Sequence, residues 1–262
     1  MLDLPVDRCA GACGSVSAMA GTGDNTENAV MLLTRLDRFN RCHPWSHNDH
    51  YSRWVERRVV AAGARDVLDI GCGTGNLIAR LRRRIPRITG LEPDTTSARA
   101  AAERFAGDSA VRIVQADFAG REPQRRWDAV TLVAVLHHLP LALAMRELRE
   151  CLHPGGRLVI VGCYRMAGPA DVLAALPAAV LNPIIGMIKH PAPASVLPAH
   201  MRAPTAEPQE SLAEIRAAAG HELPGARIRR RLFWRYTLVY DAPGGKGVAQ
   251  ASRGPGRAHT PA

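Results

Sequence analysis

The feature that most constrains the fold of this chain is a run of alternating glycines between an apolar stretch and a helical pattern. The run reads VLDIGCGTGNL over residues 67–77 and places Gly71, Gly73 and Gly75 at every second position. Glycine lets the backbone come close to a ligand because it has no Cβ atom. The free amides at the start of the following helix favour an anionic group. The run therefore predicts a strand, a tight ligand-facing turn and a helix, in that order.

The spacing of the glycines narrows the choice of ligand. A dinucleotide-binding turn would carry its third glycine at position 76, where this chain has asparagine. The run also lacks the Lys-Ser/Thr pair of a phosphate-binding loop. Neither a nicotinamide dinucleotide nor a nucleoside triphosphate is therefore indicated, and a glycine-rich turn that binds nothing is the alternative at this point.

Strand-like apolar runs alternate with helical patterns along the middle of the chain, which is typical of a parallel α/β sheet. The five strands expected first are residues 66–70, 87–91, 111–116, 127–133 and 157–161. The helices expected between them are residues 76–84, 95–105 and 141–152, with a turn at 153–156. A helix is expected again at 211–219, and residues 226–240 predict two antiparallel edge strands.

The motif D-I-G-C-G-T-G, residues 69–75, resembles the first motif of class I S-adenosylmethionine-dependent methyltransferases. The second strand ends in GLEPD and the third in QADF, as in that family. The runs WDAVTLVAVLHHL and LRECLHPGGRLVIVG continue the resemblance to residue 162. The flanking runs HPWSHNDHYSRWVERRV and LPGARIRRRLFWRYTLVY resemble, more loosely, those of bacterial small-molecule methyltransferases.

This resemblance implies a Rossmann-like, doubly wound α/β fold whose mostly parallel, seven-stranded sheet has helices on both faces and an antiparallel C-terminal edge strand. It also implies S-adenosylmethionine as the cofactor, with Glu92 on the ribose hydroxyls, Asp117 on the adenine amino group and Phe118 beside the adenine ring. Solvated acids that merely follow strands are the alternative for Glu92 and Asp117. The expected cofactor contacts are Asp69, Gly71, Cys72, Gly73, Gly75, Glu92, Pro93, Asp117, Phe118, Ala134 and Tyr51.

Two histidines, His137 and His138, follow the fourth expected strand. Ligands of open α/β sheets bind beyond the carboxyl ends of the strands, and imidazole titrates near neutrality. Either histidine is therefore a candidate catalytic base for the acceptor, with a structural role before Pro140 as the alternative. Enzymes that methylate amino groups of adenine or glutamine carry N/D-P-P-Y here, and the Val-Ala-Val-Leu-His-His of this chain argues against that subclass.

Residues 42–54 hold three more histidines, at positions 43, 47 and 50. A helical metal site is one interpretation, but Pro44 interrupts any helix there and no HExxH pattern is present. We therefore predict no metal. We expect a helix lying over the cofactor mouth, with Trp54 packed inward and Tyr51 near the methionine end of the cofactor.

Residues 163–206 interrupt the alternation and exceed the connection that the core fold needs. The apolar side chains between Val172 and Ile188 are too many for a solvated loop. We expect a lid over the acceptor or a cap on the core, with peripheral membrane contact as a third use. The prolines and glycines argue against one long helix. Because the apolar run is shorter than a membrane span of about 20 residues, no transmembrane segment is expected.

The formal net charge is +10, and nearly all the basic residues are arginine. An RNA partner is one explanation, and an arginine-rich surface is the other. The clusters at 82–84 and 229–231 are short, and no aromatic and basic platform for single strands accompanies them. We therefore expect no nucleic-acid partner.

Composition also sets the expected boundaries. Residues 1–27 and 243–262 are rich in small and polar residues without periodicity, and we expect flexible tails around a methyltransferase domain at 28–242. Met19 and Met31 are alternative translation starts. The six cysteines lack disulfide or zinc spacing, and the first residues do not form a signal-peptide pattern. A cytoplasmic location is therefore expected.

Together these patterns predict methyl transfer from S-adenosylmethionine to oxygen, nitrogen or carbon of a small-molecule acceptor. An RNA or protein methyltransferase is the alternative within the same fold, motivated by the net charge. A regulator that binds the cofactor without turning over an acceptor is the alternative of another class. The sequence favours no particular acceptor or oligomeric state.

Overall fold

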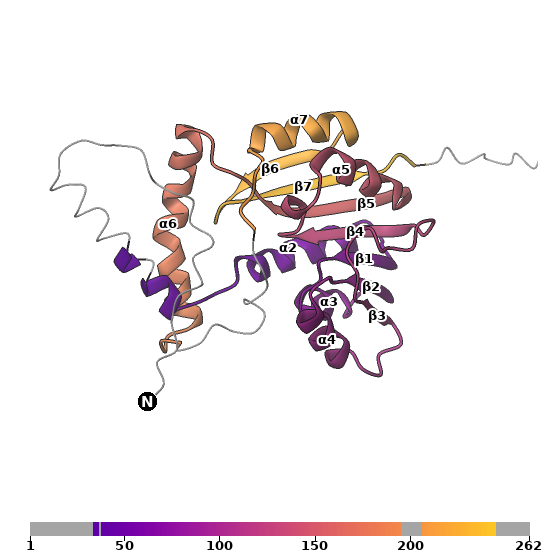
Figure 1. Ribbon diagram of the computed structural model, residues 1–262, viewed down its shortest axis with the longest axis horizontal. Coiled ribbons are helices and arrows are strands. Elements are labelled where there is room, and N and C mark those ends of the chain that lie inside the picture. The colour runs from indigo at the N-terminus through magenta and orange to yellow at the C-terminus, as the bar shows by residue number, and fades with distance from the viewer. Residues whose placement is uncertain (1–33, 37, 195–205, 245–262) are drawn as a thin grey trace, which may run out of the picture.

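The computed structural model describes residues 34–36, 38–194 and 206–244. Its centre is a seven-stranded sheet with the strand order β3-β2-β1-β4-β5-β7-β6 (Figure 1). The first five strands in this order pair in parallel, and β7 pairs antiparallel with both β5 and β6. The strands are β1 (Asp66–Ile70), β2 (Arg87–Leu91), β3 (Val111–Val114), β4 (Trp127–Val133), β5 (Leu152–Cys163), β6 (Arg227–Arg231) and β7 (Arg235–Asp241).

Helices cover both faces of this sheet, which confirms the predicted doubly wound arrangement. The helices are α2 (His47–Ala61), α3 (Asn76–Leu81), α4 (Thr95–Arg104), η1 (Leu136–His138), α5 (Leu141–Glu150), α6 (Pro169–Lys189) and α7 (Leu212–Glu222). Val67 and Leu68 show how the strands separate the two layers, because neighbouring side chains of a strand point to opposite faces. Val67 packs in the cluster under α2 and α3, whereas Leu68 packs in the cluster under α5 and α7.

The start of β5 differs from the prediction. The predicted helix 141–152 ends at Glu150, and the predicted turn at 153–156 lies inside β5 as an irregularity opposite Trp127 and Ala129. Leu152 is buried and pairs with Trp127. This pairing places the start of β5 at Leu152, five residues before the predicted start at residue 157. Gly156 allows this path, because a Cβ there would meet the carbonyl oxygens of Trp127 and Asp128 at 3.1 Å.

The prediction that residues 163–206 would not form one long helix is wrong. α6 is a single helix of 21 residues with Pro177 and Pro183 inside it. An internal proline removes one backbone hydrogen bond and kinks a helix, but most of the other residues in α6 are alanine, leucine and further apolar residues that tolerate helix. By length and apolar composition α6 is the one helix among the described residues that could cross a membrane. Figure 1 shows it beyond the ends of the parallel strands, apart from the two layers.

The expected tails and the lid lie partly outside the described residues. This holds for all of residues 1–27, for residues 195–205 and for residues 245–262. Helical turns at 34–36 and 38–42 precede α2. The turn between the two edge strands, which the sequence did not locate, lies at residues 232–234, where Phe233 and Trp234 have φ angles of 58° and 55°.

Replacing Gly162 with alanine should destabilise the fold. Gly162 lies directly opposite Tyr236 in the β5–β7 pair, and an added Cβ would overlap the ring of Tyr236, which is 1% exposed. Overpacking of a buried site costs about 1–3 kcal/mol. The matched control is Gly220→Ala in α7, where a new Cβ has nothing within 4 Å and alanine should stabilise the helix by about 0.5–1 kcal/mol. Equilibrium urea unfolding measures both shifts, and shifts of the same sign would contradict this packing.

Candidate active site

The glycine turn after β1 is held by the ends of two neighbouring strands. The amides of Gly71 and Cys72 donate to the carbonyl oxygen of Leu91 at 2.8 and 3.0 Å. Gly71 has a φ of 67°, and a Cβ there would overlap the side chain of Val135, which follows β4. Because glycine alone fits both the angle and the space, the turn stays close against β2 and β4.

Glu92 lies directly against this turn. Its Oε2 accepts from the amide of Gly73 at 2.7 Å, and its Oε1 accepts from the amide of Asp94 at 3.0 Å. The side chain is buried. Each carboxylate oxygen has two lone pairs, so both can accept a further bond from a ligand hydroxyl. Pro93, between the two acids, is exposed, and Asp94 caps α4 by accepting from the amide of Ser97.

Asp69 is the second buried acid of the site. Thr131 of β4 donates its hydroxyl to Oδ1 of Asp69 at 2.7 Å. The pKa of Asp69 is raised to about 7: burial raises it most, the hydrogen bond from Thr131 lowers it, and the charge of Glu92 raises it. A cation beside this carboxyl would lower its pKa again. Asp69 is therefore suited to a positively charged group of a ligand.

Cys72 contributes packing rather than a reactive thiolate. Burial raises the pKa of its thiol, and the charges of Asp69 and Glu92 raise it further. Its sulfur lies against Gly90 of β2, where a Cβ would meet Sγ at 2.8 Å. Those electrostatic interactions show that the structure brings Cys72, Asp69 and Glu92 together at the glycine turn.

Asp117 and Phe118, after β3, differ in exposure. Asp117 is exposed, and its Oδ1 accepts from the amide of Gly120 at 2.9 Å. Phe118 is buried in the core cluster under α5 and α7, and the guanidinium of Arg121 lies 4.3 Å from its ring centroid. Asp117 is therefore the member of the pair that is open to a ligand. The adenine contacts expected for both residues stay predictions.

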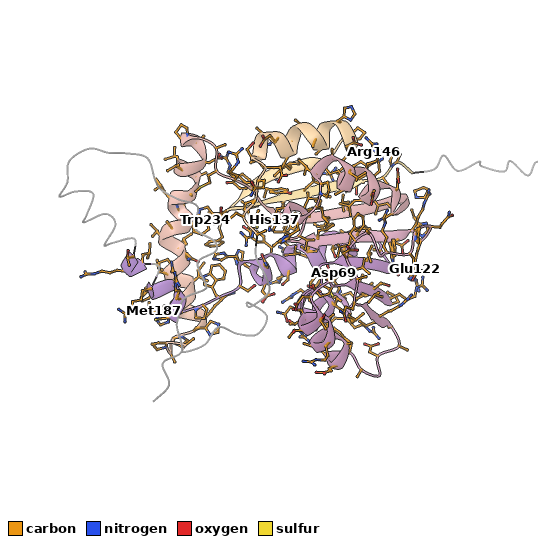
Figure 2. The ribbon with its side chains drawn as sticks, viewed as in Figure 1. Asp69, Glu122, His137, Arg146, Met187 and Trp234 are labelled. Atoms are coloured by element: carbon orange, nitrogen blue, oxygen red, sulfur yellow. The ribbon has the colours of Figure 1, made fainter. Side chains whose placement is uncertain are left out.

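His137 and His138 lie in η1 at the carboxyl end of β4. Just before them Ala134 adopts a φ of 57°, with its amide donating to the carbonyl of Val161 at 2.7 Å. The pKa of His137 is lowered to about 4, chiefly by burial and also by the charges of His138 and Arg235. His137 is therefore a neutral imidazole at pH 7, while His138 is exposed. Figure 2 shows His137 on the side of the sheet that faces α6.

The side chain of Tyr51 links α2 to the β6–β7 turn. Its side chain is buried, and its hydroxyl donates to the carbonyl of Leu232 in the β6–β7 turn at 2.8 Å. Trp54 is half-buried, with Arg58 and Arg231 over its ring. The expected place of Tyr51 near the methionine end of the cofactor stays a prediction.

Asn76 supports the glycine turn in a way that the sequence interpretation missed. Its side-chain nitrogen donates to Asp49 of α2 at 3.3 Å, and its Oδ1 accepts from Arg104 of α4 at 2.7 Å. Arg104 also donates to the carbonyl of Thr74 inside the turn at 3.2 Å. Asn76 stands where a dinucleotide motif has its third glycine, and its side chain links α2 and α4. The asparagine at this position was the sequence signal for that link.

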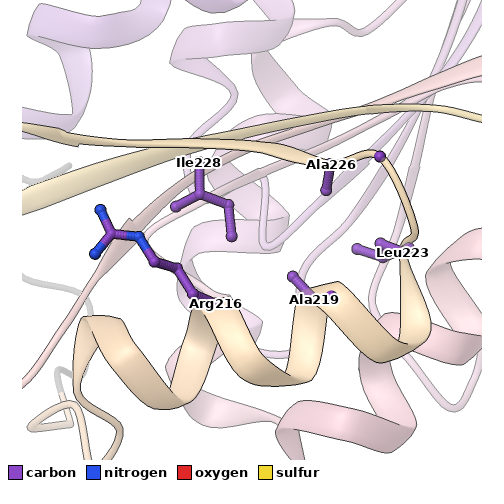
Figure 3. Close-up of a pocket in the computed structure, with 7 residues that line it drawn as sticks. Arg216, Ala219, Leu223, Ala226 and Ile228 are labelled. Carbon is purple, nitrogen blue, oxygen red and sulfur yellow. The ribbon is translucent and has the colours of Figure 1, made fainter.

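The described residues contain a hollow apart from the glycine turn and no cluster of metal ligands. A hollow of ≈ 250 Å³ lies between α7 and β6, at the far edge of the sheet (Figure 3). Its one charged lining residue is Arg216. Over the described ranges, three or more His, Cys, Asp or Glu side chains do not gather as metal ligands would. The glycine turn with its two acids therefore remains the candidate site.

Replacing Asp69 with asparagine should change how stability depends on pH. The folded-state pKa of about 7 lies above the unfolded value of 3.8, so the folded protein binds the extra proton between these values. The contribution of Asp69 to wild-type stability therefore falls as pH rises from 3.8 to 7, by on the order of 1 kcal/mol per pH unit. Asp69→Asn keeps an acceptor for Thr131 and lacks this loss, so its stability relative to wild type should rise over that range. Denaturant unfolding at several pH values measures the difference.

Asp94→Asn is the control of opposite sign. The hydrogen bonds from Ser97 lower the pKa of Asp94, so its contribution to stability is present above the unfolded pKa and is lost in acid. Relative to wild type, this variant should lose stability as pH rises out of the acid range. A flat difference for Asp69→Asn from pH 4 to 7 would contradict the burial argument.

Comparison with known proteins identifies the family of this chain. A family model described as a methyltransferase domain matches residues 68–158. An uncharacterized methyltransferase of Mycobacterium tuberculosis is 34% identical over 205 residues, covering 76% of this chain and 98% of that protein. The trans-aconitate 2-methyltransferase of Rhodopseudomonas palustris is 37% identical over 112 residues, covering 42% of this chain and 43% of its own length.

Among solved structures, a possible exported protein from Bordetella parapertussis shares the fold with a TM-score of 0.53 and 17% identity, covering 75% of this chain and 67% of the other. The Mycobacterium tuberculosis relative, of which 98% is covered, is a methyltransferase. The range matched by the domain model, residues 68–158, includes the glycine turn, Asp69 and Glu92. This chain therefore belongs to the class I S-adenosylmethionine-dependent methyltransferases, and S-adenosylmethionine is its cofactor.

Proposed function

We propose that this methyltransferase acts on a small-molecule acceptor. The observation that carries the proposal is an aromatic wall near the carboxyl ends of β4 and β5. The wall is backed by Trp45 and Phe233, which are buried and meet edge to face with ring centroids 4.8 Å apart. Ala178 and Ile185 of α6 pack in the same cluster. Its half-buried aromatic member is Trp234, and that side chain is the one that a compact, partly apolar acceptor could contact.

Arg235 connects this wall with His137. Arg235 directly follows Trp234 and donates to the carbonyl of Phe233 at 3.3 Å and to the side chain of Asn48 at 3.2 Å. Its charge also lowers the pKa of His137, so the two side chains lie close enough to interact. The wall and the candidate base therefore border the same end of the sheet.

The arginine clusters also support a small acceptor over RNA. Arg230 pairs with Asp171, Arg231 donates to the hydroxyl of Thr237 at 3.1 Å, and Arg82 pairs with Asp108 at 2.7 Å. Part of the basic surface is thus used within the fold. The relative from Rhodopseudomonas palustris is named for a small acid, which agrees with this acceptor class.

The residues at the turn fit S-adenosylmethionine. When bound, the cofactor supplies an electrophilic methyl group on a positively charged sulfur. Gly71 and Gly73 allow the backbone to approach it, and the oxygens of Glu92 can accept bonds from its ribose hydroxyls. Asp117 is open to its adenine amino group. The buried carboxyl of Asp69 favours a cationic part of the cofactor, because a nearby positive charge stabilises its ionised form.

His137 is the candidate that would accept a proton from the acceptor. Its lowered pKa of about 4 keeps the imidazole unprotonated at physiological pH. S-adenosylmethionine would supply the methyl group to the acceptor atom, and the imidazole of His137 would take up the proton that the acceptor loses. Alignment of the acceptor without a base is the alternative, since positioning alone accounts for much of the rate of such reactions.

Replacing Glu92 with glutamine should weaken binding of S-adenosylhomocysteine by about tenfold or more, since hydrogen bonds to a charged group are worth roughly 1.5–3 kcal/mol. Isothermal titration calorimetry measures the affinity. Glu103→Gln is the matched control, because Glu103 is exposed on α4 and pairs only loosely with Arg99 at 3.9 Å. Unchanged affinity in Glu92→Gln would contradict the assigned role of Glu92.

Replacing His137 with alanine should lower kcat by about 10²–10⁴-fold and leave the affinity for S-adenosylhomocysteine unchanged. The acceptor is first found by mass spectrometry, as a metabolite that gains a methyl group. His138→Ala tests the other candidate, which is exposed, and a larger loss of kcat in that variant would assign the base to His138 instead. With His137 as base, the acid limb of the kcat profile should lie near pH 4.

Other outcomes point to the alternatives. Full turnover by His137→Ala would show that alignment suffices without this base. Methylation of RNA or protein in place of any metabolite would overturn the small-molecule proposal. Cofactor binding without any methylated product would favour a regulator.

A further inference from the structure

α6 presents a long apolar surface that the described residues do not cover. Eight of its large apolar side chains are exposed, and the four most exposed are Ile188 at 72%, Leu173 at 69%, Val180 at 64% and Val172 at 56%. From residue 172 to 188 the sequence contains no charged residue. Isolated apolar side chains on a surface are ordinary, but a contiguous run of this length marks an interaction site.

The opposite edge of α6 is attached to the domain over its whole length. At the start of the helix, Asp171 pairs with Arg230. In the middle, Asn182 Oδ1 accepts from the indole of Trp45 at 2.9 Å and lies 2.7 Å from Nε2 of His47. At the end, Nδ1 of His43 bonds the carbonyl of the residue after the helix, His190, at 2.6 Å.

These contacts determine whether α6 could cross a lipid bilayer or could only lie flat on its surface. A helix that crosses a membrane must bury its whole circumference in lipid or in other spanning segments. Crossing would break every contact along the attached edge, including a close approach at Gly186, where a Cβ would meet the carbonyl of His43 at 2.6 Å. The helix can instead lie flat, with its free face in the interface and its attached face toward the protein. Its 21 residues would cover about 30 Å of surface at 1.5 Å per residue.

Positive charge borders the apolar face. Lys189 ends α6 and is exposed, with its ammonium 4.9 Å from the ring centroid of Trp45. Arg38 is exposed on the helical turns before α2, one residue before Phe39, whose ring lies 4.6 Å from that of His43. Figure 1 shows these turns beside the end of α6. An apolar helical face with basic residues at its border is typical of helices that bind anionic membrane surfaces.

The net charge of the protein also favours an anionic membrane surface as the partner of this apolar face. A second copy of this chain would bring another +10 charge against the first, which opposes self-association through this face. An anionic bilayer is attracted by that charge, and its headgroups suit the basic residues at the border. We propose that α6 docks this protein on the surface of an anionic lipid bilayer, with its apolar face at the boundary between headgroups and acyl chains. The proposal is independent of the acceptor.

Sedimentation with vesicles tests this docking on the full chain. Wild type should bind vesicles of phosphatidylcholine mixed with phosphatidylglycerol more tightly than vesicles of phosphatidylcholine alone, and added salt should weaken the binding. The double variant Leu173→Glu, Val180→Glu should bind the mixed vesicles at least about tenfold more weakly, because two apolar side chains leave the interface. Leu143→Glu is the matched control, since Leu143 is 52% exposed on α5, away from this face.

Calorimetry with S-adenosylhomocysteine shows whether each variant is folded, because none of the substituted residues belongs to the cofactor site. Loss of vesicle binding with unchanged cofactor affinity supports the proposal. Equal binding of wild type and the double variant would overturn it, and so would equal binding to neutral and anionic vesicles. A wild-type dimer in analytical ultracentrifugation that the double variant dissolves, without vesicle binding, would assign the face to a second copy and overturn it too.

Discussion

The site depends on one carbonyl oxygen, that of Leu91, which accepts the amides of both Gly71 and Cys72. Two bonds to one acceptor tie the turn after β1 to the end of β2. Glu92 directly follows β2, so the same contact sets where its carboxylate meets the amide of Gly73. Val135, from beyond β4, fills the space beside the turn. Three neighbouring strands thus converge on a single backbone geometry, and the ligand-facing groups follow from it.

Two buried acids next to this turn give the site its electrostatic character. Both side chains are buried, and the charge of Glu92 raises the pKa of Asp69. Glu92 is compensated by two backbone amides, whereas Asp69 has one hydroxyl donor, Thr131. Asp69, with this single donor, has a raised pKa. A buried acid with so little compensation is less stable than an apolar side chain in the same place.

Local chemistry explains what the sequence could predict. The strand, the turn and the start of the helix around Gly71 agree with expectation, because a glycine spacing acts within a few residues. The early start of β5 and the single helix α6 could not be predicted, because they depend on partners such as Trp127 and Trp45 that lie far away in the sequence. The same holds for Tyr51, whose hydroxyl bonds the carbonyl of Leu232, and for the core packing of Phe118.

The packing of Gly90 against Cys72 and Ile78, beneath the glycine turn, also restricts which substitutions these three positions can accept. The missing Cβ of Gly90 leaves space that Cys72 and Ile78 share, since an added atom would lie within 2.8 Å of the sulfur and 2.7 Å of Cδ1. A larger residue at any one of these positions needs a smaller one at another. Substitution effects at the three should therefore be strongly non-additive, and relatives of this chain should exchange them as a set. Beneath this turn the volume available to each of the three side chains depends on the other two, so the three positions change together.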